Sequence, residues 1–249
     1  MLTHERYRII LEVLNQRDSA TVTELAAAVH TSESTIRRDL IVLDREGHLK
    51  KVFGGAVSVR EISGTREEDL KGRERLMAGE KRRIACLAAS LIDDDDFVFL
   101  DAGTTTSCMT EFLTESNAFF VTGSLIIARR LSEGNRRVFL LGGRIKASNV
   151  CVVGADAEKQ LQRFHFTKSF LGTNGIDIEA GFSTTDPDEA IIKQTVMEQS
   201  LSSYVLADHS KFRKIFSVSF AAISRGCILT DQLPGGVLSD KTEIREATS

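Results

Sequence analysis

The chain has 249 residues and a mass of 27.4 kDa, enough for one small and one average-sized domain. Its hydrophobic content of 42% supports packed cores, but no apolar run spans a bilayer and residues 1–8 lack a signal-peptide core, which predicts a cytoplasmic protein. Four scattered cysteines without a CxxC pair predict reduced thiols, with no metal and no cofactor.

The first predicted element is a helix over residues 4–17, which carries an apolar face. The stretch 21–40 then reads as two short helices joined by a tight turn. Leu25, Ala26 and Val29 form the apolar face of the first of these helices, and either Thr21 or Thr23 can cap its start. This layout predicts a helix-turn-helix, which places its second helix in the DNA major groove.

The second helix of this pair has a buried stripe and a polar face. Ser32 is placed to cap it, and Ile36, Leu40 and Leu43 repeat at helical spacing. An ordinary solvated helix would show the same stripe, but paired arginines suit phosphates and guanine edges. The opposite face carries Ser34, Arg38, Ile41 and Arg45, flanked by Thr35 and Arg37.

A basic hairpin is predicted directly after this helix. Apolar positions in residues 48–59 flank the pair Gly54-Gly55, which is typical of a β-hairpin with a glycine turn. Lys50 and Lys51 would lie on or beside it. A basic hairpin that follows the recognition helix of a helix-turn-helix is called a wing, and a wing usually contacts the phosphate backbone or the minor groove.

These N-terminal motifs resemble those of the DeoR family of bacterial transcription regulators. The resemblance rests on TVTELA at 21–26, SESTIRRDL at 32–40 and GGA at 54–56, while Lys51 and Phe53 depart from the family pattern. It implies binding to double-stranded operator DNA. The predicted DNA-contacting residues are Ser32, Ser34, Thr35, Arg37, Arg38, Arg45, Lys50 and Lys51.

Charge separates the chain into regions. Residues 1–60 hold 9 Lys+Arg against 8 Asp+Glu, a net +1, and the remainder holds 23 against 27, a net −4. The segment 60–79 is highly charged and poor in large apolar side chains, which predicts a linker that is partly helical. We therefore expect a winged helix-turn-helix domain at 1–59, a linker at 60–79 and an effector domain at 80–249.

The second domain alternates apolar strands with helices. Strands are predicted at 97–101, 118–122, 138–143, 168–173, 203–208 and 226–231. Because these strands lack in–out alternation, they predict a mainly parallel α/β sheet covered on both faces. Ligands of such Rossmann-like sheets bind at the carboxyl ends of the strands.

The loop DAGTTT, residues 101–106, is the sharpest candidate for a ligand site. Its glycine permits close backbone approach, and hydroxyls at a helix start suit a phosphate group. A simple capped turn between strand and helix has the same composition. Polar and glycine-rich loops follow the other strands as well. By contrast, the acidic run 93–96 precedes a buried strand and reads as a solvated turn rather than a metal site.

The second domain also resembles the DeoR-family effector domain, which is similar to ribose-phosphate isomerases and CoA transferases. The resemblance rests on EKRRIA at 80–85, DAGTTT, LLGG at 140–143, LGTNGID at 171–177 and ADHSKF at 207–212, with Gly123 as a departure. It implies a phosphorylated-sugar effector. The predicted effector-binding residues are Asp101, Gly103, Thr104, Thr105, Thr106, Thr122, Ser124, Gly142, Gly143, Lys193, Asp208 and Lys211.

The resulting hypothesis is a non-enzymatic transcriptional repressor of a sugar-utilisation operon, acting as a homodimer or homotetramer and released by a phosphorylated sugar. The stretch SVSFA at 217–221 resembles the fructose-operon branch of the family, and this resemblance implies fructose 1-phosphate as the effector. The alternatives are an isomerase-like enzyme with an accessory DNA-binding domain and, less favoured, a protein-interaction module.

Overall fold

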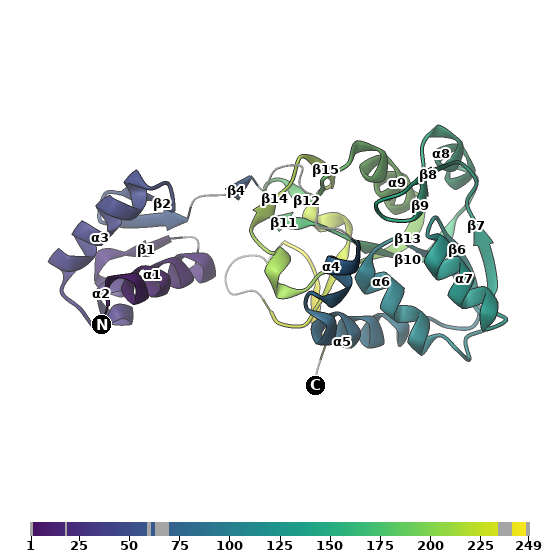
Figure 1. Cartoon of the computed structure of the whole chain (residues 1–249), viewed down its shortest axis with the longest axis horizontal. Coiled ribbons are helices and arrows are strands. Elements are labelled where there is room, and N and C mark those ends of the chain that lie inside the picture. Colours follow the sequence, from purple (N-terminus) through teal and green to yellow (C-terminus); the bar gives the residue numbers. More distant parts are fainter. Residues whose placement is uncertain (1, 18, 59–60, 63–69, 234–240, 248–249) are drawn as a thin grey trace. The chain divides into compact units, whose positions relative to one another are not determined.

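A computed structural model describes residues 2–17, 19–58, 61–62, 70–233 and 241–247. The chain divides into two compact units, with the first boundary between residues 61 and 62, and each is described separately (Figure 1).

The first unit is a winged helix-turn-helix, as predicted. Three helices, α1 (Thr3–Arg17), α2 (Val22–Val29) and α3 (Glu33–Arg45), pack with a three-stranded antiparallel sheet in the order β1-β3-β2. The hairpin of β2 (Leu49–Val52) and β3 (Gly55–Ser58) confirms the predicted wing. Strand β1 (Ser19–Thr21), which pairs with β3, was not predicted.

Local signals in the sequence set the limits of the two central helices. Thr21 and Glu24 form a reciprocal capping box at the start of α2, and His30 ends that helix in a left-handed conformation with φ of 53°. Ser32 caps α3, as predicted. The stripe of α3 lies fully inside a core shared with α1, α2 and the wing, whose members include Ile10, Leu14, Leu25, Val29, Ile36, Leu40, Leu43 and Leu49.

The second unit is built on a seven-stranded sheet in the order β17-β16-β13-β10-β5-β6-β7, and every neighbouring pair is parallel. The predicted parallel α/β architecture is confirmed. The edge strand β17 was not predicted. The strands are β5 (Phe97–Leu100), β6 (Phe119–Thr122), β7 (Arg137–Leu140), β10 (Phe166–Gly172), β13 (Ser200–Leu206), β16 (Cys227–Thr230) and β17 (Ile244–Glu246).

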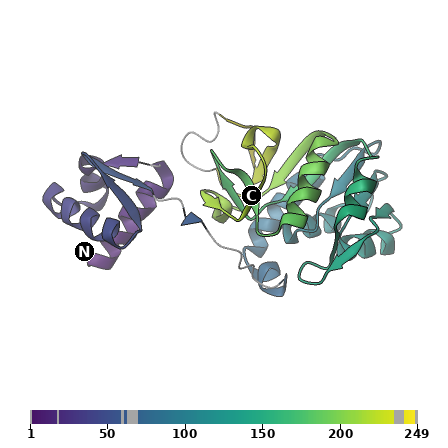
Figure 2. The same ribbon diagram turned by 90° about the horizontal axis from the view of Figure 1, so that it is seen from above.

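Helices lie on both sides of the strands (Figure 2). Helices α5 (Ala78–Ala89) and α7 (Leu125–Glu133) share one core with the sheet, whereas α9 (Pro187–Glu198) packs on β10 and β13 beside α8 (Ala155–Leu161). The predicted helix near 106–113 is split into α6 (Thr104–Cys108) and a 3-10 turn.

Short elements complete this unit. A hairpin of β8 (Arg144–Lys146) and β9 (Cys151–Val153) follows β7, and a small antiparallel sheet contains β11 (Gly175–Asp177), β12 (Gly181–Thr184) and β15 (Val218–Ala221). The remaining short elements are β4 (Glu61–Ile62), α4 (Leu70–Arg75), β14 (Lys214–Ile215) and 3-10 turns at Met109–Phe112, His209–Lys211 and Ile223–Arg225.

The predicted linker is described only in part. Residues 70–79 belong to the second unit, where they contribute α4 and the first residues of α5. Residues 63–69 lie outside the described ranges.

The strand order creates a crevice at one place in the sheet. From β5 the chain proceeds outwards through β6 and β7, whereas from β10 it proceeds the other way through β13 and β16. Loops that leave β5 and β10 therefore diverge at their carboxyl ends, which makes this the topological switch point where ligands of open α/β sheets bind.

Candidate functional sites

The exposed face of α3 presents the predicted DNA-contacting residues of that helix. Ser34, Arg38 and Arg45 are exposed, and Ile41 between them is 55% exposed. Ser32 has a structural task, because its Oγ accepts a hydrogen bond from the Thr35 N–H at 3.3 Å and lies 2.9 Å from the Thr35 Oγ1. The serine and threonine therefore shape the start of the helix, while the arginines project from it.

The two neighbouring arginines of α3 differ in their surroundings. The Arg37 guanidinium pairs with Glu33 at 3.1 Å, and the Glu33 carboxylate also accepts the Thr23 hydroxyl at 2.8 Å. The Thr23 hydrogen bond, reinforced by Arg37, holds the pKa of Glu33 below its ordinary value. Within the described ranges, neither Arg38 nor Arg45 has a hydrogen-bond or ion-pair partner, so both can contact a polyanion without first breaking a pair.

An ion pair between Arg6 and Asp39 holds helix α3 against helix α1. The Arg6 Nε and Nη2 of α1 donate to the two carboxylate oxygens of Asp39 at 2.7 and 2.9 Å, and Asp39 is only 5% exposed. The hydrogen bonds to Asp39 raise the pKa of Arg6. Such a bidentate pair fixes orientation as well as distance.

The second candidate site is a cavity of about 80 Å³ at the switch point of the parallel sheet. Seven predicted effector-binding residues line it: Asp101, Gly103, Thr104, Thr105, Lys193, Asp208 and Lys211. They come from the segment after β5 with the start of α6, from the segment after β13 with its 3-10 turn, and from α9, so the topology brings together residues more than 100 positions apart.

Lys193 lies on the inner side of this cavity. Its side chain forms an ion pair with Asp101 and donates to the Gly172 carbonyl at 2.9 Å, and both charged residues are less than 10% exposed. The same Asp101 carboxylate accepts the Gly172 N–H at 2.9 Å. This pair ties the loop after β5 to the end of β10 and to α9.

Five other predicted effector-binding residues do not line the cavity. The Thr106 hydroxyl accepts the Gly103 N–H at 2.9 Å and donates to the Asp101 carbonyl at 2.7 Å, so it is used within its own turn. The Thr122 hydroxyl donates to the Leu100 carbonyl, and the Ser124 side chain caps the start of α7. The Gln160 side chain bonds both backbone groups of Gly142, while Gly143 has φ of 151° and packs beside Val152.

Several lining residues were not among the predicted effector-binding residues, including Arg73, Lys81, Asn149 and Glu189, of which the sequence offers Glu189 as a candidate only for the enzyme alternative. Lys81 is 4% exposed, and its ammonium donates to the Arg73 carbonyl. Burial lowers the pKa of Lys81, and the Asp208 carboxylate opposes this shift. The signal for Lys81 was the motif EKRRIA, which contains this lysine but does not reveal that it turns inward.

A polar chain closes another side of the cavity. Asn149 contacts both the Arg73 guanidinium and the Glu189 carboxylate, and Glu189 also accepts from Lys146 at 2.7 Å. Burial alone would lower the pKa of Lys146, but its ion pairs with Glu189 and Asp186 raise it. These side-chain contacts thus connect α4, the β8–β9 hairpin and the start of α9.

A winged helix-turn-helix unit joined to a parallel α/β unit with a charged cavity defines a DNA-binding regulator that carries a sensor domain. Comparison with known families agrees: the DeoR-like helix-turn-helix domain matches residues 6–61, and the DeoR C terminal sensor domain matches residues 77–232. The chain therefore belongs to the DeoR family of transcription regulators.

Curated relatives extend over almost the whole chain. It is 39% identical to the uncharacterized HTH-type transcriptional regulator FruR of Bacillus subtilis (strain 168), over 92% of this chain and 91% of that protein. It is 32% identical to the lactose phosphotransferase system repressor of Staphylococcus aureus (strain N315), over 90% of each.

The similarity to solved structures is more distant. Ribose 5-phosphate isomerase A of Methanocaldococcus jannaschii aligns with 55% of each chain at 15% identity and a TM-score of 0.41. Among the described residues, no helix combines the length and the apolar character needed to cross a membrane.

Proposed function

We propose that this protein represses a sugar-utilisation operon by binding operator DNA through α3 and the wing, and that a phosphorylated sugar bound in the cavity releases it. The observation that carries this proposal is the charged cavity at the switch point, where the cationic side chains of Arg73, Lys81, Lys193 and Lys211 outnumber the three carboxylates of Asp101, Glu189 and Asp208. A dianionic ligand would find charge complementarity there that a neutral sugar lacks.

The phosphate group is assigned to the end of the cavity formed by Lys81, Lys211 and Arg73. Lys193 is already paired with Asp101, whereas Lys81 lies in the electrostatic field of Asp208 and of the two cations Lys211 and Arg73. Helix α6 has only five residues, so its amino end adds a weaker field than a full helix would. Thr104 and Thr105 line the same cavity and can donate hydroxyl hydrogen bonds.

The sugar is assigned to the polar side chains of Asn149, Glu189 and Asp101, which line the same cavity. Carboxylate oxygens and an amide suit a polyhydroxylated ligand, because they accept and donate hydrogen bonds at fixed positions. These groups are held by Lys146 and Lys193, so they are oriented before a ligand arrives.

Helix α4 offers a route from ligand to DNA. Its Arg73 lines the cavity with its side chain and accepts Lys81 at its carbonyl. Because α4 lies near the N-terminal end of the second unit, a ligand that rearranges Arg73 would act on the part of the chain that follows the winged helix-turn-helix unit. In a homodimer or homotetramer, a small change in half-site spacing would then lower operator affinity.

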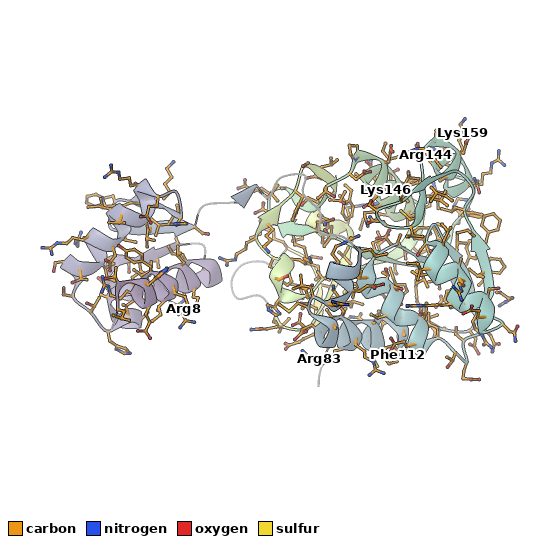
Figure 3. All side chains as sticks on the ribbon, in the orientation of Figure 1. Arg8, Arg83, Phe112, Arg144, Lys146 and Lys159 are labelled. Carbon is orange, nitrogen blue, oxygen red and sulfur yellow. The ribbon has the colours of Figure 1, made fainter. Side chains whose placement is uncertain are left out.

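The first test is a thermal-shift panel of sugar phosphates, fructose 1-phosphate included, against the matching unphosphorylated sugars. We expect stabilisation by a phosphorylated sugar only, and the same compound should weaken operator binding in a mobility-shift assay. Lys211→Glu should abolish the shift, while Lys159→Glu, at an exposed lysine of α8 (Figure 3), should not. Equal responses of both variants would contradict the assignment of Lys211.

The enzyme alternative has a separate test. A general base must be positioned to take a proton from its substrate, but the Lys193 ammonium and the Gly172 N–H both hold Asp101 through its Oδ2, which gives this carboxylate a structural role. We therefore expect no isomerase activity. Turnover that disappears in Asp101→Asn protein would overturn this assignment. Light scattering on the full chain, with and without operator, would test the proposed oligomer.

A further inference from the structure

The tip of the wing exposes an aromatic ring. Phe53, between β2 and β3, has a relative exposure of 108%, more than any other large apolar side chain of the described residues. Val52 beside it is 40% exposed. A fully hydrated phenylalanine forgoes the stabilisation that burial provides, so a partner that covers the ring and the neighbouring Val52 would gain that free energy.

The backbone that carries Phe53 is held firmly. Gly54 has φ of 83°, and its carbonyl accepts the Val22 N–H at 2.9 Å. Gly55 pairs with Thr21, so close to β1 that a Cβ there would lie 2.2 Å from the Ala20 carbonyl oxygen. On the other strand, the Lys51 N–H donates to the Asp44 Oδ1 at 3.1 Å. The turn is therefore preorganised, although the ring it presents is unsupported.

The charge around this ring indicates the kind of partner. Lys50 and Lys51 of β2 are both exposed, and no described residue pairs with either ammonium group. An apolar tip bordered by cations matches a polyanion whose interior is apolar, which describes stacked base pairs behind phosphates. A hydrophobic protein groove would favour the ring but would not call for two free lysines.

We propose that Phe53 is an apolar wedge that enters the minor groove beside the site read by α3 and partly unstacks one base-pair step. This proposal rests on the proposed operator binding. The minor groove, about 6 Å wide, admits a single ring and not a helix. Pyrimidine–purine steps open most readily, so a TA or CA step should be preferred at the wing position.

The test uses full-length protein and an operator enriched in vitro from random duplexes with the wild-type chain. Phe53→Ala should weaken operator binding by about 5- to 100-fold, the range typical of losing one base-stacking aromatic. Its salt dependence should match wild type because no charge is lost. Lys51→Ala should instead lower the slope of log affinity against log salt by about 1.

A structural readout separates a wedge from a ring that merely rests on the groove. With 2-aminopurine at each wing-proximal position in turn, wild-type protein should raise the fluorescence at one step, and Phe53→Ala should not. Phe139→Ala, at a 39% exposed ring of the second unit, serves as the matched control. Wild-type affinity and fluorescence in Phe53→Ala protein would overturn the wedge. Failure of wild-type protein to enrich any duplex would instead reject the proposed operator binding.

Discussion

In the part of the chain that the structure describes, several charged side chains are unpaired on the exposed face of α3 and the wing, whereas several in the cavity of the second unit are paired. On α3 and the wing, Arg38, Arg45 and Lys50 are exposed and unpaired within the described ranges. In the cavity, Lys193 and Asp101 are buried and paired, and Glu189 is held by Lys146 and Asn149. The exposed arginines and lysine could meet a polyanion without breaking a pair, whereas a ligand in the cavity would meet groups that are already paired.

This difference reflects dielectric environment. An exposed arginine remains solvated, so leaving it unpaired costs little until DNA arrives. A buried ammonium or carboxylate without a partner costs several kcal/mol, so the cavity must satisfy its charges internally when it is empty. A ligand that replaces an internal partner therefore changes the structure around it, which is what a sensor requires.

The largest expected effect is on the buried pair. Lys193→Met should lower the free energy of unfolding by about 3–5 kcal/mol, because it leaves Asp101 buried without its ammonium partner. Urea denaturation would measure this. The double variant Lys193→Met with Asp101→Asn should recover part of the loss, and Lys159→Met provides the exposed control. A loss no larger than that control would contradict the contrast between the sites.

On the exposed face of α3, Arg38→Ala should weaken operator binding by about 1–3 kcal/mol if the guanidinium contacts a base, with no change in the unfolding free energy. Arg37→Ala should weaken operator binding less, because the Arg37 guanidinium already forms an ion pair with Glu33. Titration against an enriched operator would compare the two. Unchanged binding in Arg38→Ala would refute this placement of the recognition face.

Ser32 distinguishes a capping role from DNA contact. Ser32→Ala should cost about 1 kcal/mol of stability, because the Thr35 N–H loses its acceptor. Ser34→Ala removes a hydroxyl that lies 2.9 Å from the Ser32 Oγ but leaves the acceptor of the Thr35 N–H in place, so it should shift the unfolding transition less. If the two variants unfold alike, the hydrogen bond at the helix start contributes nothing measurable.

The smallest expected effect is the pH response of Lys81. Because burial lowers the pKa of this group in the folded protein, the unfolded chain binds more protons between the lowered pKa and the ordinary value of 10.5. Wild-type stability relative to Lys81→Met should therefore rise as pH increases through that window. Urea midpoints at pH 7, 8, 9 and 10 would show it. A falling difference would mean that Asp208 dominates and raises the pKa.

The sequence by itself determined almost all of the winged helix-turn-helix unit. The stripe of Ile36, Leu40 and Leu43, the cap at Ser32 and the glycine pair after Val52 are local signals, because each depends on neighbours within one or two turns. The six predicted strands of the parallel sheet were recoverable for the same reason: a buried parallel strand is a continuous apolar run.

Only the tertiary structure decided the composition of the cavity. No local pattern shows that Lys193 meets Asp101 or that Lys81 turns inward, since those contacts follow from strand order and helix packing. Thr106 and Thr122 show the converse, because hydroxyls that suit a ligand by type are used on nearby backbone instead. Sequence spacing specifies which face a residue occupies, but a pocket made from distant loops exists only once the sheet has brought those loops together.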